Sequence, residues 1–268
     1  GRLKPIHAGQ DHVHQHQIRL IALAGVMPLA GSLDTVGFFG ATPDVLAQLA
    51  PVLNAKPLSP FRSVNLATDT LAESAPAVKA AVEGAIAALD VPSSTVDLMP
   101  LIRACDPPVL TLLQGEAYRA HRALIEGGGL DPVLASRFVK GATISDDDLA
   151  KARQTLETLH AEALESLLDP DSVLLLPVMP CETPRVSQCE PGSPDFSPRA
   201  LYALSAFTRF ANGLGLPVVA LPVGLDSNGM PVSVQLVARR GRDADLIAFA
   251  RDYAARLPKP PIAEVPHP

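Results

Sequence analysis

Three histidines with alternating spacing are the first residues in the sequence that could do chemistry. His12, His14 and His16 would share one face of a strand, because successive side chains of a strand point to opposite faces. Neutral imidazoles are good ligands for zinc or nickel. A metal site also needs a fourth ligand and a fixed scaffold, which this near-terminal segment does not supply. We therefore favour a solvated segment, with a reading-frame or splice change across residues 7–24 as a further alternative.

Cysteines and clustered acids are the other residue types with chemical potential. Cys105, Cys181 and Cys189 form a sparse, odd set without CxxC spacing, which argues against a disulfide framework or a zinc site and favours a reducing cytoplasm. The acids at 146–148 follow Ser145 in the pattern of a capping box. They indicate the start of a helix, where acidic side chains favour the positive end of the dipole, more than a metal site.

Composition excludes several classes of protein. The 268 residues carry a net charge of -6, with a pI near 5.6, which argues against a nucleic-acid groove lined by Lys and Arg. No apolar stretch reaches the ~20 residues that a membrane-spanning helix needs. The first 17 residues contain no apolar core of a signal peptide. These features predict a cytoplasmic protein that binds neither membrane nor nucleic acid.

Helices and strands alternate along the chain, which predicts an α/β fold with a mixed sheet. The apolar run 171–177, bounded by breakers, is typical of a fully buried strand. Asn228-Gly229 between the β-rich runs 218–222 and 232–237 predicts a hairpin. The remaining patterns predict short strands over 62–67 and 95–99 and a loop over 188–198. They predict helices over 42–54, 75–89, 110–125, 132–139, 145–168, 199–211 and 244–257.

Four segments, in order along the chain, carry recognisable motifs. Residues 25–37 read Gly-Val-Met-Pro-Leu-Ala-Gly-Ser-Leu-Asp-Thr-Val-Gly, and residues 174–180 read Leu-Leu-Leu-Pro-Val-Met-Pro. Residues 207–222 contain Thr-Arg-Phe-Ala-Asn-Gly-Leu-Gly-Leu-Pro, and residues 229–237 read Gly-Met-Pro-Val-Ser-Val-Gln-Leu-Val. Together they resemble the amidase-signature family from about residue 25 to residue 256. The resemblance implies the C-terminal part of that fold, a mixed β-sheet flanked by helices. It divides the chain into an atypical segment, 1–24, and one domain, 25–268.

The resemblance implies hydrolysis of a carboxylic amide C–N bond, giving a carboxylate and ammonia or an amine. In the family a serine attacks the carbonyl while a second serine relays a proton from a lysine, and backbone N–H groups stabilise the oxyanion. The Gly-Gly-Ser-Ser-Gly run of that site does not occur here, and residues 1–5 resemble the segment that follows it. Lys4 therefore does not match the catalytic lysine. No catalytic residue is carried over, no cofactor is implied, and we expect the chain alone to be inactive.

Candidate substrate-binding residues also come from the resemblance. Arg137 matches the arginine that, in the glutamine-using amidotransferase of that family, holds the free amino acid together with an acid. By position that acid is Ser205 here, which favours a simple amidase over a tRNA-linked glutaminase. Asn212 lies in the third motif, while Cys181 and Glu182 follow a strand end, where α/β sheets place sites. Two of these residues also have a structural interpretation. Arg137 can complement the dipole at a helix end, and Asn212 can satisfy buried backbone groups.

Competing interpretations stay open at this point. The leading one is an amidase that acts on a small amide once the catalytic segment completes it. A second is a non-catalytic binding or scaffold remnant, in which uncovered apolar surface favours a homo-oligomer. A third is a metal-binding protein that uses the histidine run.

Overall fold

A five-stranded mixed sheet forms the centre of the protein in the computed structural model, which describes residues 26–52, 57–130 and 132–258. The strands are β1 (Ser63–Ala67), β2 (Ser93–Val96), β3 (Ser172–Pro177), β4 (Val218–Leu225) and β5 (Pro231–Val237), and their order across the sheet is β2-β1-β3-β5-β4. β1 pairs in parallel with β2 and β3, whereas β5 runs antiparallel to both β3 and β4. The predicted α/β class with a mixed sheet is confirmed.

The central strand β3 has the burial that its sequence predicts. All six residues of Ser172–Pro177 are buried, because both of its edges are paired and both of its faces are covered by helices. The predicted hairpin is also confirmed. Asp226 donates its N–H to the carbonyl of Met230 at 2.7 Å, and Gly229 adopts a φ of 76°, a backbone conformation that glycine accepts without steric cost.

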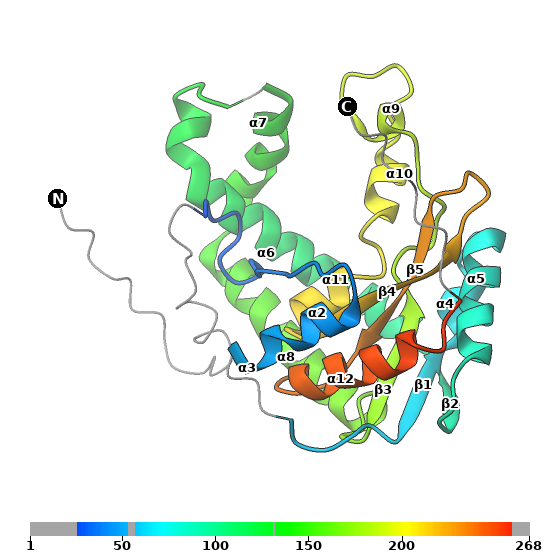
Figure 1. Ribbon diagram of the computed structural model, residues 1–268. Coiled ribbons are helices and arrows are strands. Elements are labelled where there is room, and N and C mark those ends of the chain that lie inside the picture. The colour runs from blue at the N-terminus through cyan, green and yellow to red at the C-terminus, as the bar shows by residue number, and fades with distance from the viewer. Residues whose placement is uncertain (1–25, 53–56, 131, 259–268) are drawn as a thin grey trace.

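Two helical layers cover the two faces of the sheet (Figure 1). The helices α5 (Pro76–Ala87) and α12 (Asp243–Ala254) pack over β4 and β5 around a core that includes Val234 and Tyr253. On the opposite face lie α6 (Met99–Glu126), α8 (Asp146–Ser166) and α11 (Arg209–Gly213), with a core that includes Leu112 and Phe210. Burial of such apolar side chains is the main stabilising term for a domain of this size.

The start of α6 contradicts the prediction. The strand expected over 95–99 ends at Val96, and the helix begins at Met99 and continues through Pro107 and Pro108 instead of starting at 110. Two features explain the difference. The carboxylate of Asp69 accepts the N–H of Met99 at 2.7 Å and so satisfies the helix N-terminus, while the buried face of α6 holds the helix through its proline pair.

Helix α8 begins as predicted. Ser145 and Asp148 form a reciprocal capping box, in which the Asp148 N–H donates to the Ser145 hydroxyl at 3.1 Å and the Ser145 N–H donates to the Asp148 carboxylate at 3.0 Å. Asp148 therefore caps the helix, while Asp146, in the same first turn, pairs with Arg119 of α6 at 2.8 Å. The Ser145 hydroxyl, which donates to the Asp148 carboxylate at 2.6 Å, and after it the Ser145 N–H hold the pKa of that carboxyl below its ordinary value.

The short helices complete the fold. They are α2 (Pro43–Ala47), α3 (Leu49–Val52), α4 (Thr68–Ala72), α7 (Pro132–Val139), the 3-10 helix η1 (Lys140–Thr143), α9 (Val186–Cys189) and α10 (Pro198–Ala203). The helix expected over 199–211 is two helices, α10 and α11, and part of the loop expected over 188–198 belongs to α9 and α10. Among the helices of the described residues, none combines the length and apolar character needed to cross a membrane.

Candidate functional site

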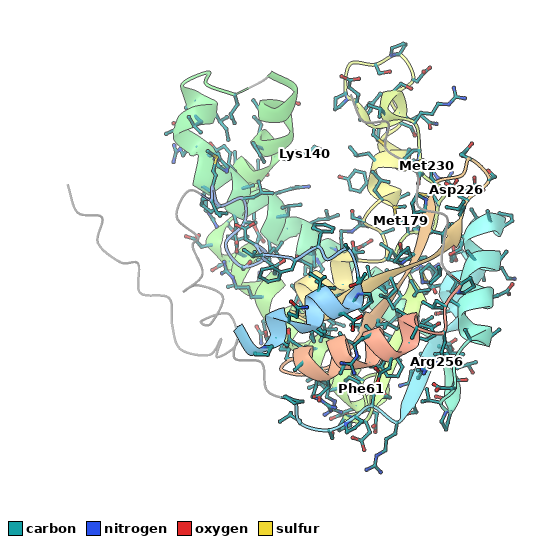
Figure 2. All side chains as sticks on the ribbon, in the orientation of Figure 1. Phe61, Lys140, Met179, Asp226, Met230 and Arg256 are labelled. Atoms are coloured by element: carbon teal, nitrogen blue, oxygen red, sulfur yellow. The ribbon has the colours of Figure 1, made fainter. Side chains whose placement is uncertain are left out.

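A shallow cavity lies beyond the C-terminal end of β3, beside the β4–β5 hairpin, and its empty space of about 340 Å³ includes open solvent. Figure 2 shows Met179 and Asp226 at this edge of the sheet, close to Met230 of the hairpin. The lining residues are Val78, Val178, Met179, Cys181, Glu182, Thr183, Asp226, Pro231, Val232 and Ser233. Cys181 and Glu182, expected at the edge of a pocket, both line this cavity.

Asp226 ties the two walls of the cavity together. Its carboxylate accepts the N–H of Thr183 from one wall at 2.9 Å, and the N–H groups of Asn228 and Met230 from the hairpin, each at 2.9 Å. These backbone donors, that of Thr183 first, hold the pKa of the Asp226 carboxyl below its ordinary value. The carboxylate of Glu182 accepts the hydroxyl of Ser227 from the same hairpin. Both acids therefore shape the cavity.

The thiol of Cys181 is half-buried in the cavity wall. Burial raises its pKa, and Cys189 adds to the increase. A raised pKa keeps the side chain as a neutral thiol at neutral pH, and the thiolate is the nucleophilic form of cysteine. Cys181 is therefore better suited to contact a ligand than to attack one.

A tight turn, 29–34, forms the ordered centre of the first motif. The carboxylate of Asp34 accepts the N–H groups of Leu29 and Ala30 at 2.9 and 3.1 Å, and Leu33 donates its N–H to the Ala30 carbonyl at 2.8 Å. Ala30 and Leu33 are buried in the core between the sheet and α6. The motif therefore forms a turn that is closed by Asp34 and that buries Ala30 and Leu33 in the core.

Side-chain amides connect the four motifs to one another. Asn212 donates to the carbonyl of Leu33 at 2.9 Å, joining the third motif to the first. Gln235, 1% exposed, donates from its side-chain nitrogen to the carbonyls of Phe207 at 2.6 Å and Pro177 at 3.1 Å. It thereby joins the fourth motif to the third, through Phe207, and to the second, through Pro177. The backbone role that the sequence allowed for Asn212 is what the structure shows.

Ser205 belongs to a separate hydrogen-bond network, and it lies just before α11 in the chain. Its hydroxyl accepts a hydrogen bond of 2.8 Å from the guanidinium of Arg209. The same guanidinium binds both carboxylate oxygens of Asp106, on α6, at 2.8 and 3.0 Å. This bidentate pair fixes the guanidinium, and with it the orientation of the Ser205 hydroxyl.

The structure does not gather the predicted residues into one site. Cys181 and Glu182 line the cavity, whereas Ser205 and Asn212 do not. Arg137 lies on α7, but its side chain is outside what the structure describes. The histidines 12, 14 and 16 also lie outside the described residues. Within the described ranges, no three His, Cys, Asp or Glu side chains are grouped closely enough to hold a metal ion.

Glu116, a half-buried acid of α6, was not singled out from the sequence. The buried side chains of α6 recur as Ile102, Cys105, Val109 and Leu112, at spacings of three and four. The stripe continues at Gly115 and Ala117, and Glu116 lies between them, half-buried. A charged residue at the border of the core-facing stripe of a helix is a signal that a binding partner is present, because an unpaired, partly buried charge is destabilising.

Comparisons with known proteins agree with the motifs. The family model described as Amidase matches residues 122–247. A 2-amino-5-chloromuconic acid deaminase of Comamonas testosteroni is 28% identical over 251 residues, which are 87% of this chain and 53% of that protein. A glutamyl-tRNA(Gln) amidotransferase subunit of Roseobacter denitrificans is 31% identical over 151 residues, which are 52% of this chain and 28% of that protein.

Solved structures give the same result for the fold. A crystal structure of an amidase superposes with a TM-score of 0.75 at 27% identity, covering 89% of this chain and 56% of that one. The allophanate hydrolase of Kluyveromyces lactis has a TM-score of 0.70 at 18% identity, over 88% of this chain and 42% of that one, and shows similarity of fold. The chain thus spans about half the length of these relatives. The resemblance that the four motifs predict is confirmed.

Proposed function

We propose that this chain, which carries the amidase-family region, is the C-terminal part of an amide hydrolase. The reaction is cleavage of the C–N bond of a small carboxylic amide to a carboxylate and ammonia or an amine. The observation that carries the proposal is the linkage of the four family motifs through Asn212 and Gln235, in a fold that superposes on an amidase. A family resemblance in sequence alone would not require these residues to meet.

The chemistry needs groups beyond those described so far. A serine nucleophile requires a positioned base, and the tetrahedral intermediate requires preorganised N–H donors. The Gly-Gly-Ser-Ser-Gly run that would provide them does not occur in this sequence. We therefore propose that hydrolysis needs additional polypeptide, that this chain alone is inactive, and that residues 25–268 act as one domain in the complete enzyme.

The surroundings of Ser205 support a simple amide over a free amino acid as the substrate. An amino acid needs a carboxylate partner for its ammonium group. The carboxylate in the Ser205 network, Asp106, is already bound on both oxygens by Arg209. A hydroxyl held in this way can donate its proton to a neutral carbonyl. We assign Arg137, Cys181 and Ser205 to substrate contact, and Asn212 to support of the site through its bond to the Leu33 carbonyl.

The exposed side chains of the first motif bear on association with other protein. Met27 of the first motif is 72% exposed, and Phe39, just beyond the motif, is fully exposed. Apolar side chains presented in this way favour contact with further polypeptide or with a second copy of the chain. We propose a homo-oligomer for the isolated chain, which sedimentation or light scattering at several concentrations would test.

The first experiment is to determine the coding DNA upstream of the Gly1 codon and across residues 7–24. If a Gly/Ser-rich segment with a lysine and two serines is found, the chain is expressed with and without it, and ammonia release from a panel of carboxamides is measured. We expect release, and labelling by a serine-reactive fluorophosphonate, from the extended chain only. A serine-to-alanine change in the added segment is the matched control. An upstream sequence without that segment, or an extended chain that releases no ammonia from any amide, contradicts the proposal.

A further inference from the structure

The turn 29–34 is attached to helix α6 through the carboxylate of Glu116. One carboxylate oxygen accepts the N–H of Ser32 at 2.9 Å, and the other accepts the Ser32 hydroxyl at 2.8 Å. The two residues are 84 positions apart in the chain. Both donors of one residue therefore end on a single carboxylate, an arrangement that fixes the orientation of the turn as well as its distance from the helix.

Helix α8 contributes a third contact to the same carboxylate. The guanidinium of Arg153 donates to Glu116 at 2.8 Å, on the oxygen that also accepts the Ser32 hydroxyl. The side chain of Glu116 is 12% exposed, whereas that of Arg153 is 51% exposed. An exposed cation held by one contact adds little to stability, but it neutralises a carboxylate that would otherwise be desolvated alone. Glu116 is thus the central group, and Arg153 supports it.

The other contacts of the turn do not replace this attachment. Asp34 accepts N–H groups of the turn itself and so closes it without joining it to a helix. Ala30 and Leu33 are buried, but Leu29 is 41% exposed and Met27 is 72% exposed, so the segment is only partly held by apolar packing. Asn212 binds the Leu33 carbonyl from α11, on the other side. The polar tie to α6 therefore depends on Glu116.

We propose that Glu116 is a positioning residue for amide hydrolysis, which fixes the Ser32 turn of the first motif on α6. This inference rests on the proposed function. Glu116 acts through the turn and not on the substrate, because its carboxylate is occupied by Ser32 and Arg153. The exchange of the Ser32 amide hydrogen reports on this role directly and requires no catalysis.

The test compares variants of the full chain by hydrogen exchange of the backbone over residues 26–40. In Glu116→Ala we expect the Ser32 amide to exchange ~10-fold faster or more, since a hydrogen bond to a charged acceptor is lost. Glu116→Gln should lie between this variant and the parent, because an amide can still accept from the N–H and donate to the hydroxyl. Glu126→Gln is the matched control on the same helix: its carboxylate pairs with Arg122 at the surface, and exchange at Ser32 should not change.

Added formate provides a readout that damage to the scaffold would not give. A small carboxylate can occupy the space left in Glu116→Ala and should slow exchange at Ser32 there, with no effect on the parent or on Glu126→Gln. If Glu116→Ala does not fold, Glu116→Gln and Ser32→Ala provide the comparison. Exchange of the residue-32 amide that is unchanged in the Glu116 variants, or that rises equally along all of α6, overturns the positioning role; Ser32→Ala keeps the backbone bond and reports only the hydroxyl contact.

Measurements of kcat/KM distinguish the role proposed for Glu116 from the amidase proposal on which it rests. In the chain extended by its upstream segment, Glu116→Ala should lower kcat/KM for the best amide, and formate should partly restore it. Faster exchange with unchanged kcat/KM overturns the catalytic role of the turn and leaves the amidase proposal intact. A parent enzyme without ammonia release removes the amidase proposal, while the exchange data still decide whether Glu116 holds the turn.

Discussion

The side-chain amide of Asn212 donates a 2.9 Å hydrogen bond to the carbonyl of Leu33, across 179 positions of the chain. It connects two motifs that the sequence shows only as separate segments. A buried carbonyl that loses its donor is destabilised by the desolvation that the bond had offset. The contact therefore accounts physically for an asparagine at this position of α11.

Replacing Asn212 by alanine should lower the free energy of unfolding by about 1–2 kcal/mol, because the Leu33 carbonyl loses its partner. Urea unfolding followed by circular dichroism measures the change. Gln154→Ala removes an exposed amide from α8 and serves as the control, with an expected change within about 0.5 kcal/mol. Equal effects of the two variants would contradict the structural role of Asn212.

Gly141→Ala should destabilise the protein by about 1–3 kcal/mol or more, through overpacking. A Cβ at this position would lie 2.1 Å from the carbonyl oxygen of Gln114 and 2.6 Å from the Cβ of Tyr118, where η1 crosses α6. Gly84→Ala is the matched control, because nothing lies within 4 Å of its added Cβ. In the interior of α5 that change should stabilise by roughly 0.5–1 kcal/mol. Thermal unfolding of both variants tests the opposite signs.

Arg242→Met should cost about 3–5 kcal/mol, because it leaves the buried Asp245 carboxylate without its cation. The guanidinium binds Asp245 at 2.7 Å and the Ser59 carbonyl at 2.6 Å, and it lies over the ring of Phe61 at 4.3 Å. Arg251→Met removes a surface pair with Asp252 and should change stability by less than about 1 kcal/mol. Denaturant midpoints that shift equally for the two variants would show that burial of the Arg242 pair is unimportant.

Stability should fall as the pH rises above the ordinary range of a cysteine thiol. Burial, with a smaller contribution from Asp106, raises the pKa of Cys105 to about 12. An unfolded cysteine loses its proton near pH ~8.5, so above that pH the native state binds more protons than the unfolded state, and the free energy of unfolding decreases. Burial also raises the pKa of Tyr253, which acts in the same direction at higher pH.

The contribution of Cys105 is isolated by comparison with Cys105→Ala. Between about pH 8 and pH 10 the parent should lose more stability than the variant, at up to ~1.4 kcal/mol per pH unit. Urea unfolding at several pH values gives both slopes. Identical slopes would mean that the buried thiol does not titrate between the two states as proposed.

Local signals in the sequence predicted the elements that depend on neighbouring residues. The β3 run, the Asn228-Gly229 hairpin and the Ser145 capping box were all recognised because each is specified within a few residues. The predicted start of α6 was wrong, because Asp69 accepts the N–H of Met99 at the helix start and tertiary packing holds the helix through its proline pair. The prediction of one helix over 199–211 was also wrong. The chain turns between α10 and α11, where the Phe207 carbonyl accepts a hydrogen bond from Gln235.

The candidate site was predictable only in part. Cys181 and Glu182 could be placed at a cavity because they follow a strand end, a position that depends on topology more than on side-chain contacts. Glu116 could not be linked to Ser32, because nothing in the sequence shows which of two distant segments will meet.

The position of β3 in the sheet has a consequence for how the chain reaches its native state. Ser63 of β1 aligns with Ser172, and Leu174 aligns with Val237 of β5, so β3 has its partners far away on both sides along the sequence. Contacts of such long sequence separation slow folding. During synthesis β3 emerges well before β5, so the edge of β3 that pairs with β5 stays unpaired until the last strand has left the ribosome. An unpaired strand edge can pair with another chain, so aggregation competes with folding until β5 is in place.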